Sequence, residues 1–167
     1  MGFSFKPAES HKQEKEHNLK VCLVASAGGH LSQLLKLADS WTGYRTFCIS
    51  TSSVVGEKLQ KYGSVFIVGE CNRQHPLDVL KVLSRSTKII FQQRPEVVIS
   101  TGAGVGCIVC FLAKLLGAKI IWIDSIANVE RLSLSGRMVR IIADMFFVQW
   151  PQLAARYKNV QFGGAIV

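Results

Sequence analysis

Two glycine-containing turns carry the residues in this sequence that are best suited to chemistry. The first is residues 26–30 (SAGGH), which separates a short apolar run from a segment with apolar residues at helical spacing. Gly28 and Gly29 let backbone N–H groups approach an anion closely, and the N-terminus of the following helix adds its positive dipole. His30 can donate to a phosphate or act as a base near neutral pH. The turn predicts a phosphate site; the alternative is a tight strand-to-helix turn with an incidental histidine.

The second turn is residues 101–106 (TGAGVG), which follows another apolar run. Thr101, Gly102 and Gly104 can bind an anion in the same way, because the turn again leads into a helix N-terminus. The alternative is that its glycines only permit close packing of helix on sheet. Two such turns at one edge of a sheet favour a shared binding site.

Neither turn fits a nucleotide cofactor. The G-x-G-x-x-G dinucleotide fingerprint and the Gly-Lys-Ser/Thr ending of a P-loop are both absent. Residues 50–53 (STSS) contain no acidic residue where a ribose-binding carboxylate is expected after the second strand. We therefore expect no NAD, FAD or other cofactor.

The cysteines predict neither a metal site nor a disulfide framework. There are five, an odd number, and the sequence begins without the apolar core of a signal peptide. Cys107 and Cys110 form a C-x-x-C motif, but it lies in a very apolar segment and has no second ligand pair. We expect two buried structural cysteines, no metal and a reducing, cytoplasmic setting.

A carboxylate and a hydroxyl close the apolar run at residues 119–124. Asp124 at the carboxyl end of a strand is well placed to bind a sugar hydroxyl or accept a proton, and Ser125 follows it. Asp124 can equally cap the next helix or pair with Arg131. It is the candidate for a catalytic carboxylate, with both alternatives open.

Short apolar runs alternate with helical segments along nearly the whole chain. This alternation is typical of a parallel sheet with helices on both faces, in which ligands bind outside the carboxyl ends of the strands. We predict strands at residues 20–25, 45–50, 65–68, 96–100, 119–124 and 145–148, and helices at residues 31–38, 54–62, 76–92, 105–116, 133–142 and 151–157. The fold class is α/β and Rossmann-like. Residues 1–19 are predicted to be a disordered leader and residues 20–167 a single domain.

The charge of the chain indicates an anionic partner. The formal net charge is +9, and the lysines and glutamates of residues 1–19 cancel, so the surplus lies on the folded part. Nucleic acid, phospholipid or a phosphorylated substrate would suit such a surface. Because no helix-turn-helix, zinc or aromatic-basic motif is present, we expect no nucleic acid.

One predicted helix has the pattern of a membrane surface. Lys81, Arg85 and Lys88 recur at i, i+4 and i+7, and apolar residues cover most of the rest of residues 77–91. A basic stripe bordered by apolar residues suits an anionic membrane, and the alternative is a solvated face on a buried helix. The long apolar stretch 106–123 contains lysines and a glycine break, so we expect a buried helix and strand there, not a transmembrane helix.

Four motifs together resemble one family. They are SAGGH at residues 26–30, STGAG at 100–104, IDS at 123–125 and FVQWP at 147–151. The chain resembles the accessory subunit of two-component bacterial capsule and exopolysaccharide glycosyltransferases. It is also similar to the eukaryotic membrane-anchor subunit of the dolichol-linked N-acetylglucosamine transferase, and to the N-terminal half of the one-chain enzyme that makes the lipid-linked peptidoglycan precursor. The similarity runs from about Lys20 to Val167.

The resemblance implies one half of a GT-B glycosyltransferase. That half binds a polyprenyl-pyrophosphate-linked sugar at the cytoplasmic face of the membrane, and a separate catalytic subunit binds the UDP-sugar. The chain alone is then expected to be inactive. His30 and Asp124 are the candidate catalytic residues. The acceptor's pyrophosphate would face Gly28, Gly29, His30, Thr101, Gly102, Gly104 and Ser125.

The resemblance also bears on the partner and on the membrane. Trp150, Pro151, Tyr157 and Phe162 put large apolar groups near the C-terminus, where we expect the partner to dock. The sequence has Asp124 before Ser125 where relatives often have glutamate, which weakens a catalytic role for that carboxylate. It lacks the N-terminal anchor of the eukaryotic subunits, so peripheral membrane binding is expected. The alternative function is a stand-alone, small Rossmann-type enzyme, which nucleotide binding by the isolated chain would favour.

Overall fold

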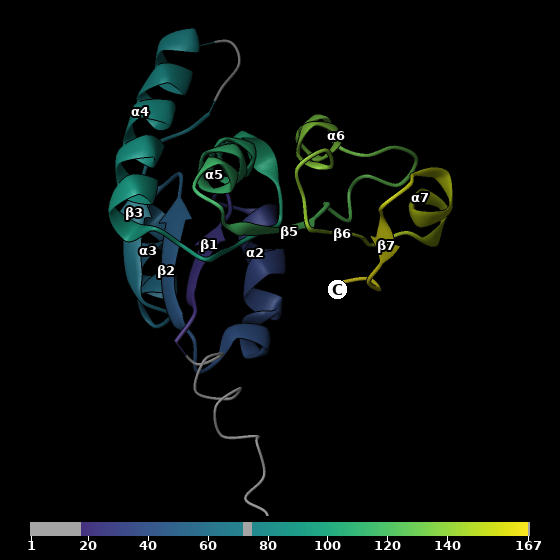
Figure 1. The fold of residues 1–167 in the computed structure, drawn as a ribbon, viewed down its shortest axis with the longest axis horizontal. Coiled ribbons are helices and arrows are strands. Elements are labelled where there is room, and N and C mark those ends of the chain that lie inside the picture. The colour runs from purple at the N-terminus through teal and green to yellow at the C-terminus, as the bar shows by residue number, and fades with distance from the viewer. Residues whose placement is uncertain (1–17, 72–74, 167) are drawn as a thin grey trace, which may run out of the picture.

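Seven parallel strands form one sheet with helices on both faces (Figure 1). The structure is a computed structural model and describes residues 18–71 and 75–166. The strand order is β3-β2-β1-β4-β5-β6-β7. The strands are β1 (Lys20–Val24), β2 (Arg45–Ser50), β3 (Ser64–Ile67), β4 (Val97–Ser100), β5 (Lys119–Ile123), β6 (Met145–Val148) and β7 (Gln161–Phe162). The predicted leader lies almost wholly outside the described residues.

The helices fall into two groups according to the face that they cover. On one face lie α4 (Pro76–Gln93), α5 (Ala103–Leu115) and α6 (Leu134–Val139), and on the other lie α2 (Gly29–Lys36) and α3 (Gly56–Gln60). The remaining helical elements are α7 (Pro151–Arg156) and the 3-10 turns η1 (Ala38–Trp41) and η2 (Ser53–Val55). Within the part of the chain that the structure describes, no helix has both the length and the hydropathy to cross a membrane.

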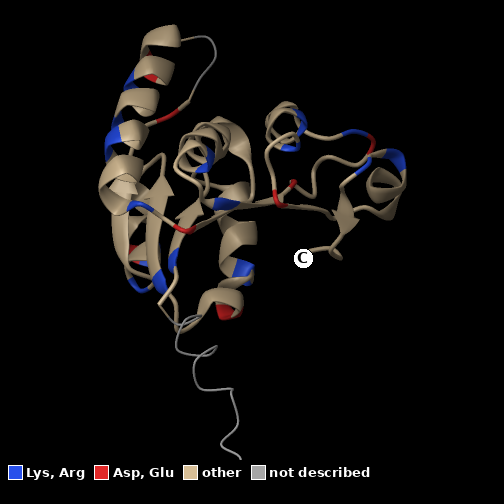
Figure 2. Cartoon of the chain, viewed as in Figure 1, with Lys and Arg blue, Asp and Glu red and all other residues tan. Residues whose placement is uncertain are grey.

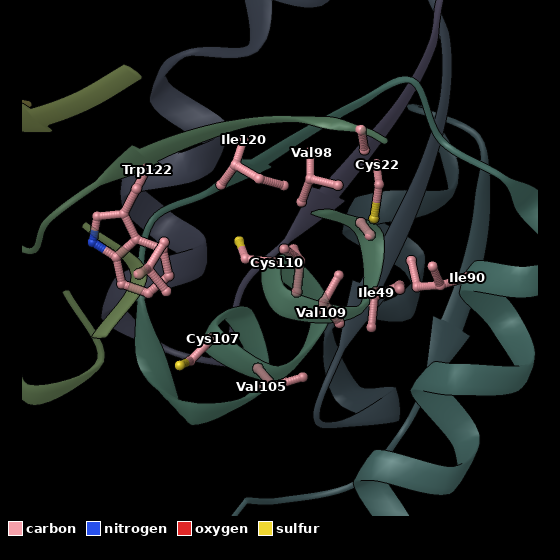
Figure 3. Close-up of a cluster of buried hydrophobic side chains, with 14 of the residues drawn as sticks. Cys22, Ile49, Ile90, Val98, Val105, Cys107, Val109, Cys110, Ile120 and Trp122 are labelled. Atoms are coloured by element: carbon pink, nitrogen blue, oxygen red, sulfur yellow. The ribbon is translucent and has the colours of Figure 1, made fainter. Parts of the chain in front are cut away.

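Alternation of side chains along the strands builds one core on each face. In β1, Cys22 and Val24 belong to the core under α4 and α5, while Val21 and Leu23 belong to the core under α2 and α3. Helix α5 is the centre of the larger core, and Figure 3 shows it against the strands. Side chains labelled there include Cys22, Ile49, Val98, Val105, Val109, Cys110, Ile120 and Trp122. Each fully buried aliphatic side chain contributes about 1.5–3 kcal/mol of transfer free energy, which fixes this helix on the sheet.

The strand order reverses between β1 and β4. The chain leaves β1 toward β2 and leaves β4 toward β5, so the connections after these two neighbouring strands diverge. A crevice outside the carboxyl ends of the strands at such a point is where open α/β sheets bind ligands. Both glycine turns of the sequence start from this point.

All six predicted strands are present, and β2 and β6 have the predicted bounds. Helices α2 and α5 begin two residues earlier than predicted, because the glycine turns supply their first residues. The predicted helix at residues 54–62 divides into η2 and α3. Strand β7 was not predicted, since it has only two residues and both are exposed.

The two faces of the sheet differ in how fully β4–β6 are covered. Toward α5 and α6, Val98, Ile120 and Phe146 are at most 2% exposed. On the opposite face, Ile121 and Phe147 are half-buried and line an apolar cavity of about 320 Å³. This cavity lies between η1 and residues 163–166.

Candidate functional site

The two glycine turns come together as two helix N-termini at the switch point. Gly28 precedes α2 with φ 104°, and Gly102 precedes α5 with φ 129°, a backbone conformation that favours glycine. Neither helix has a side-chain hydrogen bond at its N-cap. The first-turn N–H groups of both helices are therefore not capped by these residues, and such groups bind anions.

His30 and Thr101 join the two turns by reciprocal hydrogen bonds. Nδ1 of His30 lies 2.8 Å from the carbonyl oxygen of Thr101, and the Thr101 hydroxyl donates to the carbonyl oxygen of His30 at 2.7 Å. A carbonyl beside Nδ1 requires that this nitrogen carry the proton. In the neutral ring Nε2 is then the acceptor, which suits a base, and the protonated ring would donate to an anion.

The structural reasons for glycine differ between the positions of the two turns. A Cβ at Gly102 would lie 2.6 Å from the His30 ring, and one at Gly104 would lie 2.9 Å from Cys71 Sγ, so both permit close packing. A Cβ at Gly28 or Gly29 would meet nothing within 4 Å. Gly28 needs its positive φ, but neither packing nor backbone conformation requires a glycine at Gly29. Open space in front of Gly29 is what a ligand approaching the backbone would need.

A cavity of about 500 Å³ lies beside these turns, a volume typical of ligand sites. His30, Gly104 and Ser125 line it, so the structure brings together residues from both turns and from the loop after β5. Val79 of α4 and Met138 of α6 contribute apolar walls. The cavity thus combines polar groups at the sheet edge with an apolar rim between helices.

Asp124 is fully engaged inside the chain. It is 1% exposed, and its carboxylate accepts from the Ser133 hydroxyl at 2.6 Å, the Ser133 N–H at 2.9 Å and the Trp122 indole at 3.3 Å. The Ser133 hydroxyl in turn accepts from the N–H of Gly136 in α6. Of the predicted alternatives, the structure shows the capping role. The carboxylate of Asp124 binds Ser133, the N-cap residue of α6, and not Arg131. Its carboxylate is not directed at the cavity.

Two buried amides lie behind the site; Gln149 belongs to the FVQWP motif, and Gln33 was not singled out in the sequence. Gln149 Nε2 donates to Gln33 Oε1 of α2 at 2.7 Å, and both residues are at most 8% exposed. A glutamine at the end of an otherwise apolar strand is only a weak sequence signal for a buried hydrogen bond, because its partner lies 116 positions away in the sequence. Buried amides of this kind are normally hydrogen-bonded and fix the arrangement of the elements that carry them.

Helix α4 exposes a mixed basic and apolar surface. Lys81, Arg85 and Lys88 are exposed, as predicted, and Figure 2 shows basic residues along this helix. Lys81 pairs with Asp78 at 3.1 Å, and Arg85 donates to the carbonyl of Val68 at 3.2 Å. Four large apolar residues of the same helix are exposed: Leu77 (72%), Leu80 (62%), Leu83 (40%) and Phe91 (54%). The solvated-face alternative accounts for the charges but not for these apolar residues.

The predicted partner residues differ in accessibility. Pro151 is exposed and Phe162 is 51% exposed at β7. Trp150 and Tyr157 are half-buried; the indole of Trp150 donates within the chain, and Arg140 and Arg156 lie over the ring of Tyr157. Phe162 is therefore the aromatic residue of this group with most surface available to another protein.

Both cysteines of the C-x-x-C pair are buried, as predicted. Cys107 is 7% exposed and Cys110 is inaccessible. Burial raises the pKa of Cys110, with a further rise from Cys107, and burial raises the pKa of Cys48 to about 12. Among residues 18–71 and 75–166, no group of three His, Cys, Asp or Glu side chains could hold a metal ion.

The sequence is similar to known oligosaccharide biosynthesis proteins. The family described as "Oligosaccharide biosynthesis protein Alg14 like" matches residues 66–166, more than half of the chain. The UDP-N-acetylglucosamine transferase subunit ALG14 of Yarrowia lipolytica is 24% identical, over 99% of this chain and 86% of that protein. The subunits of the same name from Rattus norvegicus and Homo sapiens are 26% and 28% identical, over 95% and 90% of this chain and 88% and 84% of those proteins. These names support the oligosaccharide branch of the resemblance and not its capsule or exopolysaccharide branch.

Solved structures share the fold. MurG of Acinetobacter baumannii superposes with a TM-score of 0.67 at 18% identity, over 88% of this chain and 46% of that chain. UDP-N-acetylglucosamine 2-epimerase of Rickettsia bellii gives a TM-score of 0.65 at 13% identity, over 89% and 45%. The chain thus spans about half the length of these structures. At these identities the likeness concerns the fold, and it confirms a Rossmann-like domain of the GT-B type.

Proposed function

Because the chain belongs to the family of Alg14-like oligosaccharide biosynthesis proteins, we propose that it is a subunit of a UDP-N-acetylglucosamine transferase and binds the lipid-linked acceptor. The observation that carries the acceptor role is the open space in front of Gly29, at an uncapped helix N-terminus beside the 500 Å³ cavity. A pyrophosphate at this position would receive backbone N–H groups from α2 and, across the cleft, from α5.

His30 is the proposed reactive side chain. It lines the cavity, and its bond to Thr101 fixes the ring between the two turns. The ring would donate to the acceptor's pyrophosphate when protonated, or take a proton from the acceptor hydroxyl through Nε2 when neutral. Ser125 lines the same cavity and offers a hydroxyl, while Asp124 holds the surrounding loop in place.

The donor sugar is assigned to a separate catalytic subunit. Relatives whose lengths this chain covers by 84–88% are themselves named as subunits of a transferase, which supports a division of the reaction between chains. Phe162 at β7, which is in register with Val148, and the half-buried Ile121 and Phe147 on the opposite face of the sheet offer apolar surface for this partner. Aromatic side chains in such a position are frequent hot spots.

The acceptor role also explains the surface of α4. A polyprenyl chain keeps the acceptor in the bilayer, so its pyrophosphate is reached only at the membrane surface. Exposed Leu77 and Leu80 beside Lys81 and Arg85 suit the interface of an anionic, cytoplasmic leaflet. Val79 of the same helix lines the cavity, so the proposed membrane surface and the acceptor site adjoin.

The test is reconstitution of the transferase. Affinity purification of the tagged full chain from its native source should bring down a UDP-sugar-binding protein. The complex should transfer N-acetylglucosamine from UDP-N-acetylglucosamine to a prenyl-pyrophosphate-linked sugar, and the chain alone should not. Turnover by the chain alone, or tight binding of UDP-N-acetylglucosamine to it, would instead favour a stand-alone Rossmann-type enzyme.

A further inference from the structure

A row of side chains after β6 donates to the backbone of the loop after β5. This loop, residues 124–130, joins β5 to the approach to α6 and has no regular structure. The four contacts are Gln149 Nε2 to Asp124 O (3.0 Å), Trp150 Nε1 to Ile126 O (2.7 Å), Gln152 Nε2 to Val129 O (3.4 Å) and Arg156 Nη1 to Glu130 O (3.0 Å). Four donors from one short segment thus serve four carbonyls of one short loop.

These contacts matter because the loop is a wall of the cavity. Ser125, Ala127 and Asn128 line it together with residues of α4, α5 and α6. An irregular loop cannot satisfy its carbonyls through a ladder, so donors from elsewhere decide its conformation. Within the loop itself, the Asn128 N–H donates to the carbonyl of Ser125 at 3.0 Å, which forms one turn but does not fix that turn against the sheet.

Gln149 extends the same system to two further segments. Its Nε2 also donates to Gln33 of α2, three residues after His30, and its Oε1 accepts from the N–H of Ile166 at 2.8 Å. The orientation of the amide is determined by these partners, because Asp124 O can only accept and the Ile166 N–H can only donate. One side chain therefore relates the loop, the helix that carries His30 and the C-terminal segment.

We infer that Trp150 and Gln149 are positioning residues that hold loop 124–130 as the wall of the acceptor cavity. The inference rests on the proposed function for its ligand, a prenyl pyrophosphate. It gives the FVQWP motif at residues 147–151 a role inside the chain: the Trp150 indole holds the loop, whereas Phe162 remains the proposed docking aromatic. Neither positioning residue touches the reacting atoms, since both act through the backbone of the loop.

The experiment compares two tryptophan-to-phenylalanine variants of the full chain. Trp150→Phe keeps an aromatic ring and removes the N–H that holds Ile126 O. Trp41→Phe is the matched control, because the Trp41 indole N–H is buried and has no hydrogen-bond partner among the described residues. Arg156→Ala is a second variant at an exposed position, where a folding failure is not expected. The measurements are the Kd of farnesyl pyrophosphate, amide hydrogen exchange and Tm.

Trp150→Phe should weaken farnesyl pyrophosphate binding by about three- to tenfold, the effect of one lost hydrogen bond. Amides of residues 125–130 should exchange faster in that variant and in Arg156→Ala, while β1 and β4 keep wild-type protection. Trp41→Phe should change neither the Kd of farnesyl pyrophosphate nor the amide exchange of residues 125–130. If Trp150→Phe and Arg156→Ala lower Tm but leave the affinity and the loop exchange at wild-type values, the positioning role is wrong. A wild-type chain that fails to bind farnesyl pyrophosphate overturns the acceptor assignment instead, and the exchange data then still decide whether the loop is held as described.

Discussion

His30 and Thr101 hold each other across the switch point of the sheet. Nδ1 of His30 lies 2.8 Å from the carbonyl oxygen of Thr101, and the Thr101 hydroxyl donates to the carbonyl oxygen of His30 at 2.7 Å. The N-termini of α2 and α5 are thereby tied together by residues within two positions of their N-caps. Thr101 is inaccessible and His30 is half-buried, and the two hydrogen bonds orient the His30 ring between the turns.

His30→Ala should reduce the activity of the assembled transferase by about 10²-fold, as expected for a lost acid–base or charge-stabilising group. Folding and partner binding should persist, because His30 is only half-buried. The measurement is kcat/KM with a prenyl-pyrophosphate-linked acceptor, and His75→Ala at an exposed position is the control. A kcat/KM near the wild-type value in His30→Ala would contradict the proposed catalytic role and leave His30 only its structural contact with Thr101.

Gly29→Val should be more damaging to activity than His30→Ala while leaving the fold intact. The structure has room for the new side chain, and helix propensity favours valine over glycine, so Tm should not fall. A branched side chain would nevertheless occupy the space in which a pyrophosphate approaches the backbone. Gly56→Val is the matched control, since Gly56 also begins a helix and faces open space. Equal acceptor affinity in the two variants would contradict the phosphate site at α2.

The sequence predicted the parts of the site that depend on local structure. A strand, a Gly-Gly turn and a helix are specified within residues 20–38, so the strand-turn-helix geometry at Gly29 followed from neighbouring residues alone. The contact of Trp150 did not follow, and for Asp124 the sequence left capping of the next helix as one of several alternatives. Asp124 accepts from Ser133 nine positions away, and Trp150 donates to Ile126 24 positions away, and both contacts exist only once the sheet has formed. Composition and periodicity carry no information about such pairings.

Asp144 joins three elements at the opposite end of the sheet. Its carboxylate accepts from Lys114 of α5 at 2.7 Å, from Lys119 of β5 at 3.0 Å and from the Ile120 N–H at 2.8 Å. Partial burial alone would raise the pKa of Asp144, but the hydrogen bonds from Lys114, Ile120 and Lys119 outweigh it and hold this pKa well below its usual range. The carboxylate therefore tethers the start of β6 to α5 and to the start of β5, the strand that leads into loop 124–130.

Asp144→Asn should lower the free energy of unfolding at pH 7 by about 1 kcal/mol, because part of the network is exposed to solvent. A lowered pKa in the folded state adds stability above the ordinary aspartate pKa of about 3.9, and this stability is lost as the pH falls below that value toward the folded pKa. The difference between the two proteins, measured by urea unfolding, should shrink from pH 7 to pH 3. A difference that stays constant over this range would contradict an ionic contribution from Asp144.

Peripheral membrane binding through α4 is the prediction that separates this surface from an ordinary solvated helix. Each basic residue near an anionic leaflet contributes about 1 kcal/mol, so Lys81, Arg85 and Lys88 together give a useful and reversible attraction. Burial of Leu77 and Leu80 in the interface adds about 25 cal/mol per Å² of apolar surface. Added salt should weaken the electrostatic part, because screening shortens its reach.

The test is co-sedimentation of the full chain with vesicles that contain or lack anionic lipid. The triple variant Lys81→Glu/Arg85→Glu/Lys88→Glu should lose binding to anionic vesicles. The control is Lys36→Glu/Lys58→Glu/Lys61→Glu, which changes the net charge equally at exposed positions of α2, α3 and the residue after α3, and should retain binding. If both variants lose binding alike, net charge and not α4 is responsible. If neither loses it, the membrane surface lies elsewhere, and α6 with its exposed Leu134, Met138 and Arg137 is the next candidate.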